Sequence, residues 1–306
     1  MLYRVVLLLA FSVFSSSSFA ADFKNPQRVN ILNLPKGTGG TAISTEEPFI
    51  SRDGRFLMFN TASHENHRDL HYAKKINAQW VYQGEIGESV NTKDDVQGNP
   101  TMDSQNNIYY VDTTAHPMIR AATFSPATGL LKNIRDFEGV PTRKVQLFKQ
   151  KFTGNMGVEI SKDGRFAFFS RATWNMIGLK PGLIIASNLL LSKREGREFV
   201  YNETYAKHIL QNINTDDLEY AASISENGKE LFFTRWKTQD LRKGLLRSVI
   251  MRASRDSWFD PFSKPEVIRS IGSRHFVEGP AISPDGKQLY YHKKEGNKFR
   301  IYKVTR

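Results

Sequence analysis

The chain has 306 residues, of which 40% are hydrophobic, 12% aromatic and 24% charged, and it contains no cysteine. This composition is that of a globular protein, and the lack of cysteine excludes disulfides, thiolate nucleophiles and cysteine-ligated metal centres. The formal net charge of +12 favours anionic partners without identifying one.

Residues 1–20 have the pattern of a secretory signal peptide. Arg4 provides a positive charge, residues 5–13 form a short apolar core, and residues 18–20 (Ser-Phe-Ala) fit the small-x-small rule for cleavage after the alanine. The apolar core is too short for a transmembrane helix, which needs about 20 apolar residues. We therefore predict an exported protein, periplasmic or secreted, with no transmembrane anchor and a mature chain of residues 21–306. An uncleaved N-terminal anchor is the alternative.

One motif recurs five times along the rest of the chain. In each copy an apolar segment leads into a turn, usually Asp-Gly or Asn-Gly, and a second segment rich in aromatic residues follows. These turn pairs favour the positive φ of tight hairpins, so each copy predicts a β-hairpin. The copies are residues 49–59, 101–111, 159–169, 223–233 and 281–291.

The spacing of the copies predicts a β-propeller. From the turn residue Gly54 to the turn residue Gly286 there are 232 residues in four intervals, a mean of 58. A third strand is expected after each hairpin and a fourth in most units, and four strands make one propeller blade. Consecutive aromatic residues such as those at 168–169 point to opposite faces of a strand, so both faces of each sheet must be covered.

The last unit reaches the end of the chain after its third strand, whereas the strand predicted at residues 29–32 has no hairpin of its own. We expect residues 29–32 to pair with residues 301–304 and close the ring, which also removes an open sheet edge. The predicted fold is all-β, a single closed propeller of four-stranded blades over residues 21–306. Five blades are favoured, six are possible, and an open solenoid is the structural alternative.

The repeated units resemble the WD40-like, Asp-Gly-containing propeller repeat (PD40) of TolB-like proteins. The best copy is residues 280–291, Pro-Ala-Ile-Ser-Pro-Asp-Gly-Lys-Gln-Leu-Tyr-Tyr, and the resemblance covers residues 28–306. It implies an exported β-propeller, although TolB-like proteins usually have six blades and an additional N-terminal α/β domain. Because the matching residues are turn and core positions, the resemblance implies architecture more than activity.

The candidate ligand-binding residues belong to loops at the channel mouth, on the face opposite the Asp-Gly turns. Basic and aromatic residues of several blades are predicted to converge on this rim: Arg171, Trp174, Arg235, Trp236, Lys237, Arg274, His275 and His292. They favour carboxylate, phosphate or sulfate groups on a sugar-like ligand, with Trp174 and Trp236 as stacking platforms. A solvated basic surface without a ligand is the alternative.

Two functions remain open from the sequence. The leading hypothesis is a non-catalytic propeller that binds a protein partner or an anionic envelope or extracellular polymer. The alternative is a carbohydrate-active enzyme, a glycoside hydrolase or a polysaccharide lyase, that uses channel carboxylates and histidines. Glu46 and Glu278 are its candidates because each stands four residues before the Ile of its motif. That repetition also fits a purely structural role.

No metal ion, cofactor or nucleic acid is expected. His64, Glu65, His67 and His71 are close in sequence, but on a hairpin they need not converge on one ion. Glycine-rich phosphate loops and dinucleotide fingerprints do not occur in the sequence. Export disfavours nucleic acid as a partner.

Overall fold

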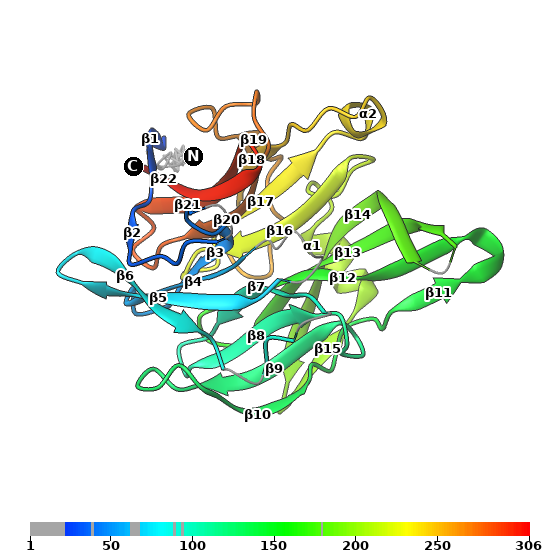
Figure 1. Ribbon diagram of the computed structural model, residues 1–306. Helices are drawn as coiled ribbons and strands as arrows, with labels where there is room; N and C mark the ends of the chain where they lie inside the picture. The colour runs from blue at the N-terminus through cyan, green and yellow to red at the C-terminus, as the bar shows by residue number, and fades with distance from the viewer. Residues whose placement is uncertain (1–21, 38–39, 62–67, 88–89, 93–94, 179) are drawn as a thin grey trace, which may run out of the picture.

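The computed structural model describes residues 22–37, 40–61, 68–87, 90–92, 95–178 and 180–306. Within these ranges the chain forms five antiparallel four-stranded units arranged around a common axis (Figure 1). The predicted signal peptide at residues 1–20 lies outside the described ranges. No helix among the described residues is long and apolar enough to cross a membrane.

Each blade runs from an inner strand at the axis to an outer strand at the periphery. Blade 1 consists of β3 (Glu46–Ile50), β4 (Phe56–Asn60), β5 (Leu70–Ile76) and β6 (Gln79–Glu85). Blade 2 consists of β7 (Gln97–Met102), β8 (Asn107–Asp112), β9 (Ile119–Phe124) and β10 (Leu131–Asp136). Blade 3 consists of β12 (Lys151–Ile160), β13 (Phe166–Ile177), β14 (Lys180–Glu195) and β15 (Glu198–Tyr201).

Blade 4 consists of β16 (Leu218–Ile224), β17 (Glu230–Trp236), β18 (Val249–Ser254) and β19 (Glu266–Val267). Blade 5 consists of β20 (Val277–Ile282), β21 (Gln288–Glu295), β22 (Lys298–Thr305) and β1 (Lys24–Arg28). The elements outside this pattern are β2 (Ile31–Leu32), β11 (Lys144–Gln146), the 3₁₀ turn η1 (Leu147–Lys149), α1 (Glu203–Ile209) and α2 (Thr238–Arg242). The five-bladed prediction is therefore confirmed.

The ring is closed by the N-terminal strand, as expected, but mainly by residues 24–28; of the predicted segment, Val29 donates its backbone N–H to the carbonyl oxygen of Ile301 at 2.8 Å. β1 pairs antiparallel with β22, with Arg28 opposite Tyr302. Residues 31–32, which the sequence places in this closure, form β2 and pair in parallel with β6 of blade 1. The N-terminal segment thus completes blade 5 and then joins the outer edge of blade 1, so that it spans the junction of the first and last blades.

The five turns take the conformation that their residues predict. The turn residues have φ between 63° and 72°: Gly54, Asn106, Gly164, Gly228 and Gly286. In blade 1 the Ser51 hydroxyl donates to Asp53 Oδ1 at 2.6 Å and accepts from the backbone N–H of Phe56 at 2.9 Å. The same pair of bonds is formed by Ser161, Ser225 and Ser283. The repeated Ser-x-Asp-Gly sequence is therefore turn chemistry.

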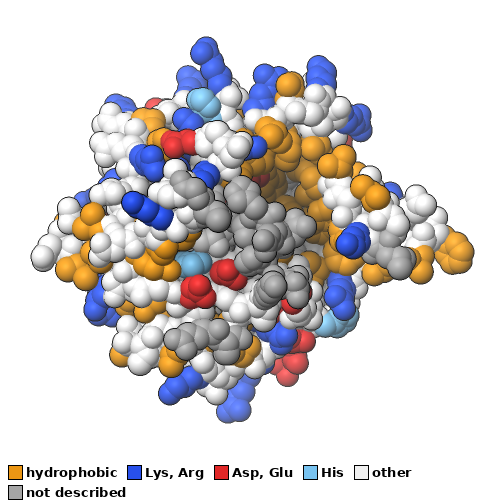
Figure 2. Space-filling view, in the orientation of Figure 1, with side chains coloured by type: hydrophobic (Ala, Val, Ile, Leu, Met, Phe, Trp, Pro, Cys, Tyr) orange, Lys and Arg blue, Asp and Glu red, His pale blue; other side chains and the backbone are white. Residues whose placement is uncertain are grey.

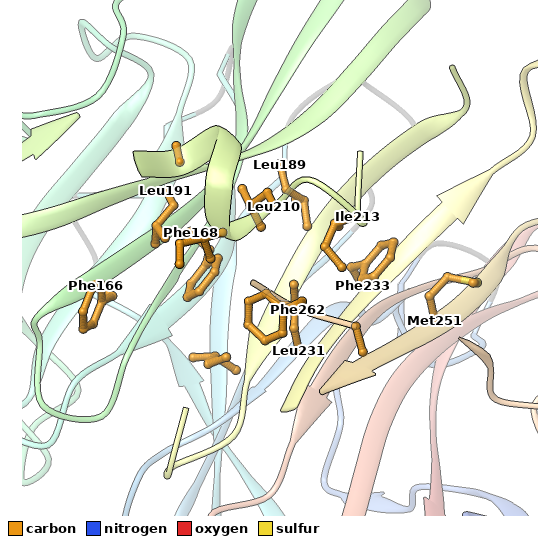
Figure 3. Close-up of a cluster of buried hydrophobic side chains, with 14 residues drawn as sticks. Phe166, Phe168, Leu189, Leu191, Leu210, Ile213, Leu231, Phe233, Met251 and Phe262 are labelled. Carbon is orange, nitrogen blue, oxygen red and sulfur yellow. The ribbon is translucent and has the colours of Figure 1, made fainter. Parts of the chain in front are cut away.

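The hydrophobic core lies between the blades, in one cluster of buried side chains at each of the five junctions. Adjacent aromatic residues on the second strand of a blade enter the junctions on its two faces, as predicted. Phe168 points into the junction of blades 3 and 4, and Phe169 points into the junction of blades 2 and 3. Figure 3 shows the first of these junctions, where Leu210 after α1 packs over Phe168 and Leu189.

Candidate functional site

A β-bulge interrupts each inner strand near the end at which the strand begins, opposite the Asp-Gly turns. We call this end of the channel the mouth. In blade 1 the pairing register shifts between Glu46 and Phe49, and the other four blades show equivalent shifts. Seven residues before the turn residue, four blades have a positive φ: Glu47, Asn99, Ala221 and Gly279. Bulges leave backbone N–H groups outside the ladder, and these groups need other acceptors.

Side chains of the preceding blade accept these N–H groups. The acceptors all stand six residues after a turn residue: Asn60, Ser170, Thr234 and His292. The bonds measure 3.2, 2.9, 3.2 and 3.0 Å respectively. His292, a ligand-binding candidate from the sequence, is 2% exposed and occupies a position whose repeated role is to join blades.

Glu278 is held by two neighbours at the mouth. His292 Nδ1 accepts from the backbone of Glu47, so the neutral ring carries its proton on Nε2, which lies 3.2 Å from Glu278 Oε2 and donates to it. The Tyr220 hydroxyl donates to Glu278 Oε1. Both carboxyl oxygens of Glu278 are therefore engaged in hydrogen bonds to neighbouring side chains.

Glu46 stands at the equivalent position of the next blade in a different environment. It is 2% exposed; its Oε2 lies 3.4 Å from Arg68 Nη2, and its Oε1 accepts no hydrogen bond from the described part of the chain. Burial raises its pKa, and the nearby Glu47 and Glu278 add to this, whereas Arg68 and His292 oppose it. The mouth therefore holds two carboxyl groups with different surroundings: both oxygens of Glu278 have partners, whereas Glu46 has an oxygen without a partner in the described part of the chain and a raised pKa.

An apolar wall adjoins these carboxyl groups at the mouth, with Tyr220 in contact with Glu278. At the level of Glu46 and Glu278, eight residues before the turn residue, blade 3 has Met156 and blade 4 has Tyr220. Both belong to a cluster that also contains Leu218, Trp236, Ile184, Leu241 and Phe276. Figure 2 shows a hollow near the middle of this face with hydrophobic side chains along one side. The mouth thus combines acidic groups from blades 5 and 1 with an apolar surface from blades 3 and 4.

Part of the predicted basic rim makes contacts within the protein. Arg171 donates to the carbonyl oxygens of Pro141 and Thr142 at 2.8 and 2.6 Å. Arg235 lies 2.8 Å from Glu219, a carboxylate with 0% side-chain exposure. Arg171 and Arg235, which the sequence analysis assigns to ligand binding, therefore make intramolecular contacts, Arg171 with neutral carbonyl oxygens and Arg235 with a buried carboxylate.

The remaining rim candidates divide into two groups. Trp236 is 9% exposed, and its Nε1 donates to the carbonyl oxygen of Leu245 at 3.2 Å. Trp174 lies on the long strand β13 and packs against the ring of Phe152 at 5.5 Å. The exposed candidates are Lys237, Arg274 and His275.

Of the weighed metal ligands, residues 64, 65 and 67 lie outside the described ranges, and His71 is buried in blade 1. Its ring stacks on Phe59 at 5.8 Å, and its Nδ1 is 2.9 Å from the Tyr82 hydroxyl. Among the described residues no group of three or more metal-ligating side chains is found. His71 is a packing residue, as the strand position implied.

We expect His71 to make the fold sensitive to acid. Burial lowers its pKa from 6.5 to about 4, so between these values the unfolded chain binds a proton that the folded chain does not. Stability is therefore lost as the pH falls from 6.5 to 4, by an amount on the order of 3 kcal/mol. His71→Gln should flatten this part of the curve of unfolding free energy against pH, whereas His116→Gln, at an exposed position, should leave it unchanged. Equal acid sensitivity in both variants would contradict this assignment.

Tyr220 and Arg68 are site residues that the sequence analysis missed. Tyr220 stands four residues before the Ile of its motif, the same spacing that singled out Glu46 and Glu278. Tyr220 is found when all five copies are aligned on their turn residues and every side chain at this position is considered, whether acidic or not. Arg68 does not stand at a position that the repeat singles out.

Comparisons with known proteins show the fold. No family model matches the sequence, and no curated protein matches it. The chain is similar to a solved structure described as a glycoside hydrolase, with TM-score 0.55 and 9% identity over 92% of both chains. It is also similar to a putative exo-β-1,3-galactanase from Bifidobacterium bifidum, with TM-score 0.50 and 10% identity over 92% of both chains. TolB from Acinetobacter baumannii gives TM-score 0.44 and 11% identity over 87% of this chain and 55% of that one. At these identities the similarity establishes one property of the chain, which is that it is a β-propeller.

Proposed function

We propose that this propeller binds a neutral, hydroxyl-rich carbohydrate at the channel mouth. The observation that carries the proposal is the pair Glu46 and Glu278, equivalent residues of adjacent blades, of which Glu46 has a buried oxygen without a partner in the described chain. Sugar hydroxyls donate hydrogen bonds to carboxylate oxygens, and such charge-assisted bonds are stronger than neutral ones.

The surroundings of this pair support a neutral ligand over an anionic one. Arg68 interacts electrostatically with three carboxyl groups, those of Glu46, Glu47 and Glu278, so the site has an acidic excess that repels further carboxylate or phosphate. The apolar wall with Tyr220 offers a surface for the C–H face of a sugar ring. An anionic polymer, the ligand favoured by composition, loses support because Arg171 and Arg235 are used internally.

Export to the periplasm or the external medium is part of this proposal. It is supported by the signal-like pattern of residues 1–20. A polysaccharide of the cell envelope or the surroundings is the ligand that such a location would offer.

Hydrolysis of the bound carbohydrate is the second candidate, and the raised pKa of Glu46 is the observation that favours it. Glycosidic bond cleavage uses two carboxyl groups, and a raised pKa suits the one that acts as general acid. In this reading Glu46 protonates the leaving oxygen, and Glu278 serves as base or nucleophile.

The test is a panel of neutral, N-acetylated and uronate-containing oligosaccharides, followed by calorimetry with any that bind. We expect neutral sugars to bind and uronates to be rejected. Glu278→Gln and Glu46→Gln should each weaken binding about tenfold or more, because a hydrogen bond to a charged group contributes about 1.5–3 kcal/mol. Glu198→Gln, at an exposed position on the outer strand of blade 3, is the control.

Preference for uronates, or unchanged affinity in both mouth variants, would overturn the binding proposal. Release of reducing ends from the bound sugar separates the two candidates. If the protein hydrolyses the sugar and both Glu variants abolish this activity, the function is hydrolysis. If the sugar binds without being cleaved, the protein is a non-catalytic receptor.

A further inference from the structure

Blade 3 extends well beyond the other blades. Its strands β12, β13 and β14 have 10, 12 and 16 residues, whereas the corresponding strands of blade 1 have 5, 5 and 7. The extra length, with β11 added at its edge, forms a projection at the right of Figure 1. We call this projection the arm and define it as residues 144–156, 171–178 and 180–187.

Two hairpin ends lie next to each other at the tip of the arm. The first is the turn between β11 and β12, where Gln146 pairs with Lys151 around η1. The second is the β13–β14 connection, where Ile177 pairs with Lys180. The backbone N–H of Met176 donates to the carbonyl oxygen of Gln150 at 2.8 Å and so joins the two ends.

The tip carries large apolar side chains that touch little of the protein. Phe148 is fully exposed, and four others are between 52% and 69% exposed: Val145, Leu147, Ile177 and Leu183. Isolated apolar residues are normal on a protein surface, but a group of them at the end of a projection marks an interaction site. Exposure of this group to water is unfavourable and is relieved when the group is buried in another apolar medium.

The charge of the arm is of one sign. Lys144, Lys149, Lys151 and Lys180 are exposed on it. The sequence has no Asp or Glu from residue 139 to residue 158 or from residue 164 to residue 194. A second copy of the arm would therefore bring lysines against lysines, which disfavours self-association through β11. Charge complementarity requires an anionic partner.

We propose that the arm docks on the surface of an anionic lipid bilayer, with Leu147 and Phe148 inserted among the headgroups. The tip is convex, so it suits penetration into a soft apolar medium better than capture of a peptide in a groove. Apolar side chains flanked by lysines are the combination by which interfacial elements bind membranes, with each lysine attracted to the negative surface. The proposal does not depend on the ligand of the channel mouth.

The test is co-sedimentation of the mature chain with two kinds of vesicle, phosphatidylethanolamine mixed with phosphatidylglycerol and phosphatidylcholine alone. We expect binding to the anionic vesicles only, with an affinity that falls as salt rises. The double variant Leu147→Ser/Phe148→Ser should bind at least tenfold more weakly, and so should Lys149→Glu/Lys151→Glu.

Two variants control for general loss of apolar or positive surface. Phe259→Ser removes a phenylalanine that is 69% exposed in blade 4, and Lys132→Glu reverses an exposed charge on β10 of blade 2. Both should bind the anionic vesicles as the unchanged protein does, and all variants should melt at the same temperature. Failure to bind anionic vesicles, or equal binding by the arm variants and the controls, would overturn the proposal. A second copy of the chain is the competing partner for the tip, and analytical ultracentrifugation tests for it. A dimer that forms in the unchanged protein but not in Leu147→Ser/Phe148→Ser would assign the tip to self-association and would also overturn the membrane proposal.

Discussion

Replacement of Arg52 by methionine is expected to lower the free energy of unfolding by about 3–5 kcal/mol, although Arg52 lies in a turn segment. Its side chain leaves blade 1 and reaches blades 2 and 3. Nε donates to the carbonyl oxygen of Met102 in blade 2 at 3.1 Å, and Nη2 lies 3.1 Å from Glu159 Oε1 in blade 3. Both charged side chains are at most 4% exposed. Loss of the cation leaves a buried carboxylate without a counter-charge.

Glu159 extends this link to a fourth blade through a repeated contact. The residue five positions before the turn residue is Thr101 in blade 2 and Ser223 in blade 4. Each hydroxyl accepts a hydrogen bond from a backbone N–H of the next blade, that of Ile160 or Ile282 respectively. In blade 3 that residue is Glu159, which accepts from Ile224 at 3.1 Å. Blade 3 thus has a charged side chain where blades 2 and 4 have a hydroxyl, and Arg52 compensates for the charge.

The repeat itself supplies the control. Arg52→Met/Glu159→Thr removes both charges and keeps a hydroxyl acceptor for the N–H of Ile224. Because the buried carboxylate is gone, the double variant should recover most of the stability that Arg52→Met loses, as measured by urea unfolding at pH 7. Additive losses in the double variant would show that the two side chains act independently and would refute the charge-compensation argument.

The five hairpins are predictable from the sequence because their chemistry is local. Ser51, Asp53 and Gly54 close the first turn among themselves, and no distant residue is needed for it. The covering of both sheet faces is equally local in origin, since adjacent aromatic residues on one strand must point in opposite directions. Regular spacing then determines the number of blades.

The exact closing strand is less predictable because its side chains carry little pattern. Residues 29–32 have an apolar pattern that predicts a strand, whereas β1 has the sequence Lys-Asn-Pro-Gln-Arg and all of its residues are exposed. An outer strand of a blade needs only backbone pairing, and a proline is tolerated at a sheet edge. The anchor of β1 is instead Phe23, one residue before the strand.

The environment of the candidate site depends on contacts between blades, which no local pattern encodes. Trp236 is covered by Phe276, which lies 40 positions further along the chain at a ring distance of 5.0 Å. His292 meets Glu47 across the closure of the ring, at a sequence separation of 245 residues. The sequence could therefore place Glu46 and Glu278 at equivalent positions, but it could not show that the neighbouring basic and aromatic residues are used to hold the blades together.

Deletion of residues 22–28 is expected to have the second large effect, a loss of at least about 3–5 kcal/mol together with aggregation. Phe23 is 4% exposed and packs edge-on against Phe232 at 5.8 Å, and truncation of a buried phenylalanine alone costs about this much. The deletion also uncovers β22, whose free edge can then pair with another chain. Thermal unfolding with light scattering measures both consequences.

Two point variants separate the contributions of the side chain and the strand. Phe23→Ala keeps β1 and should lower stability without aggregation of the folded protein, because the edge of β22 stays paired. Lys24→Ala changes an exposed side chain on the same strand and should have no measurable effect. If the deleted chain instead melts at the temperature of the intact one and stays monomeric, β1 contributes nothing to closure. The ring would then be held by contacts between the inner strands of blades 5 and 1, where β20 and β21 lie against β3.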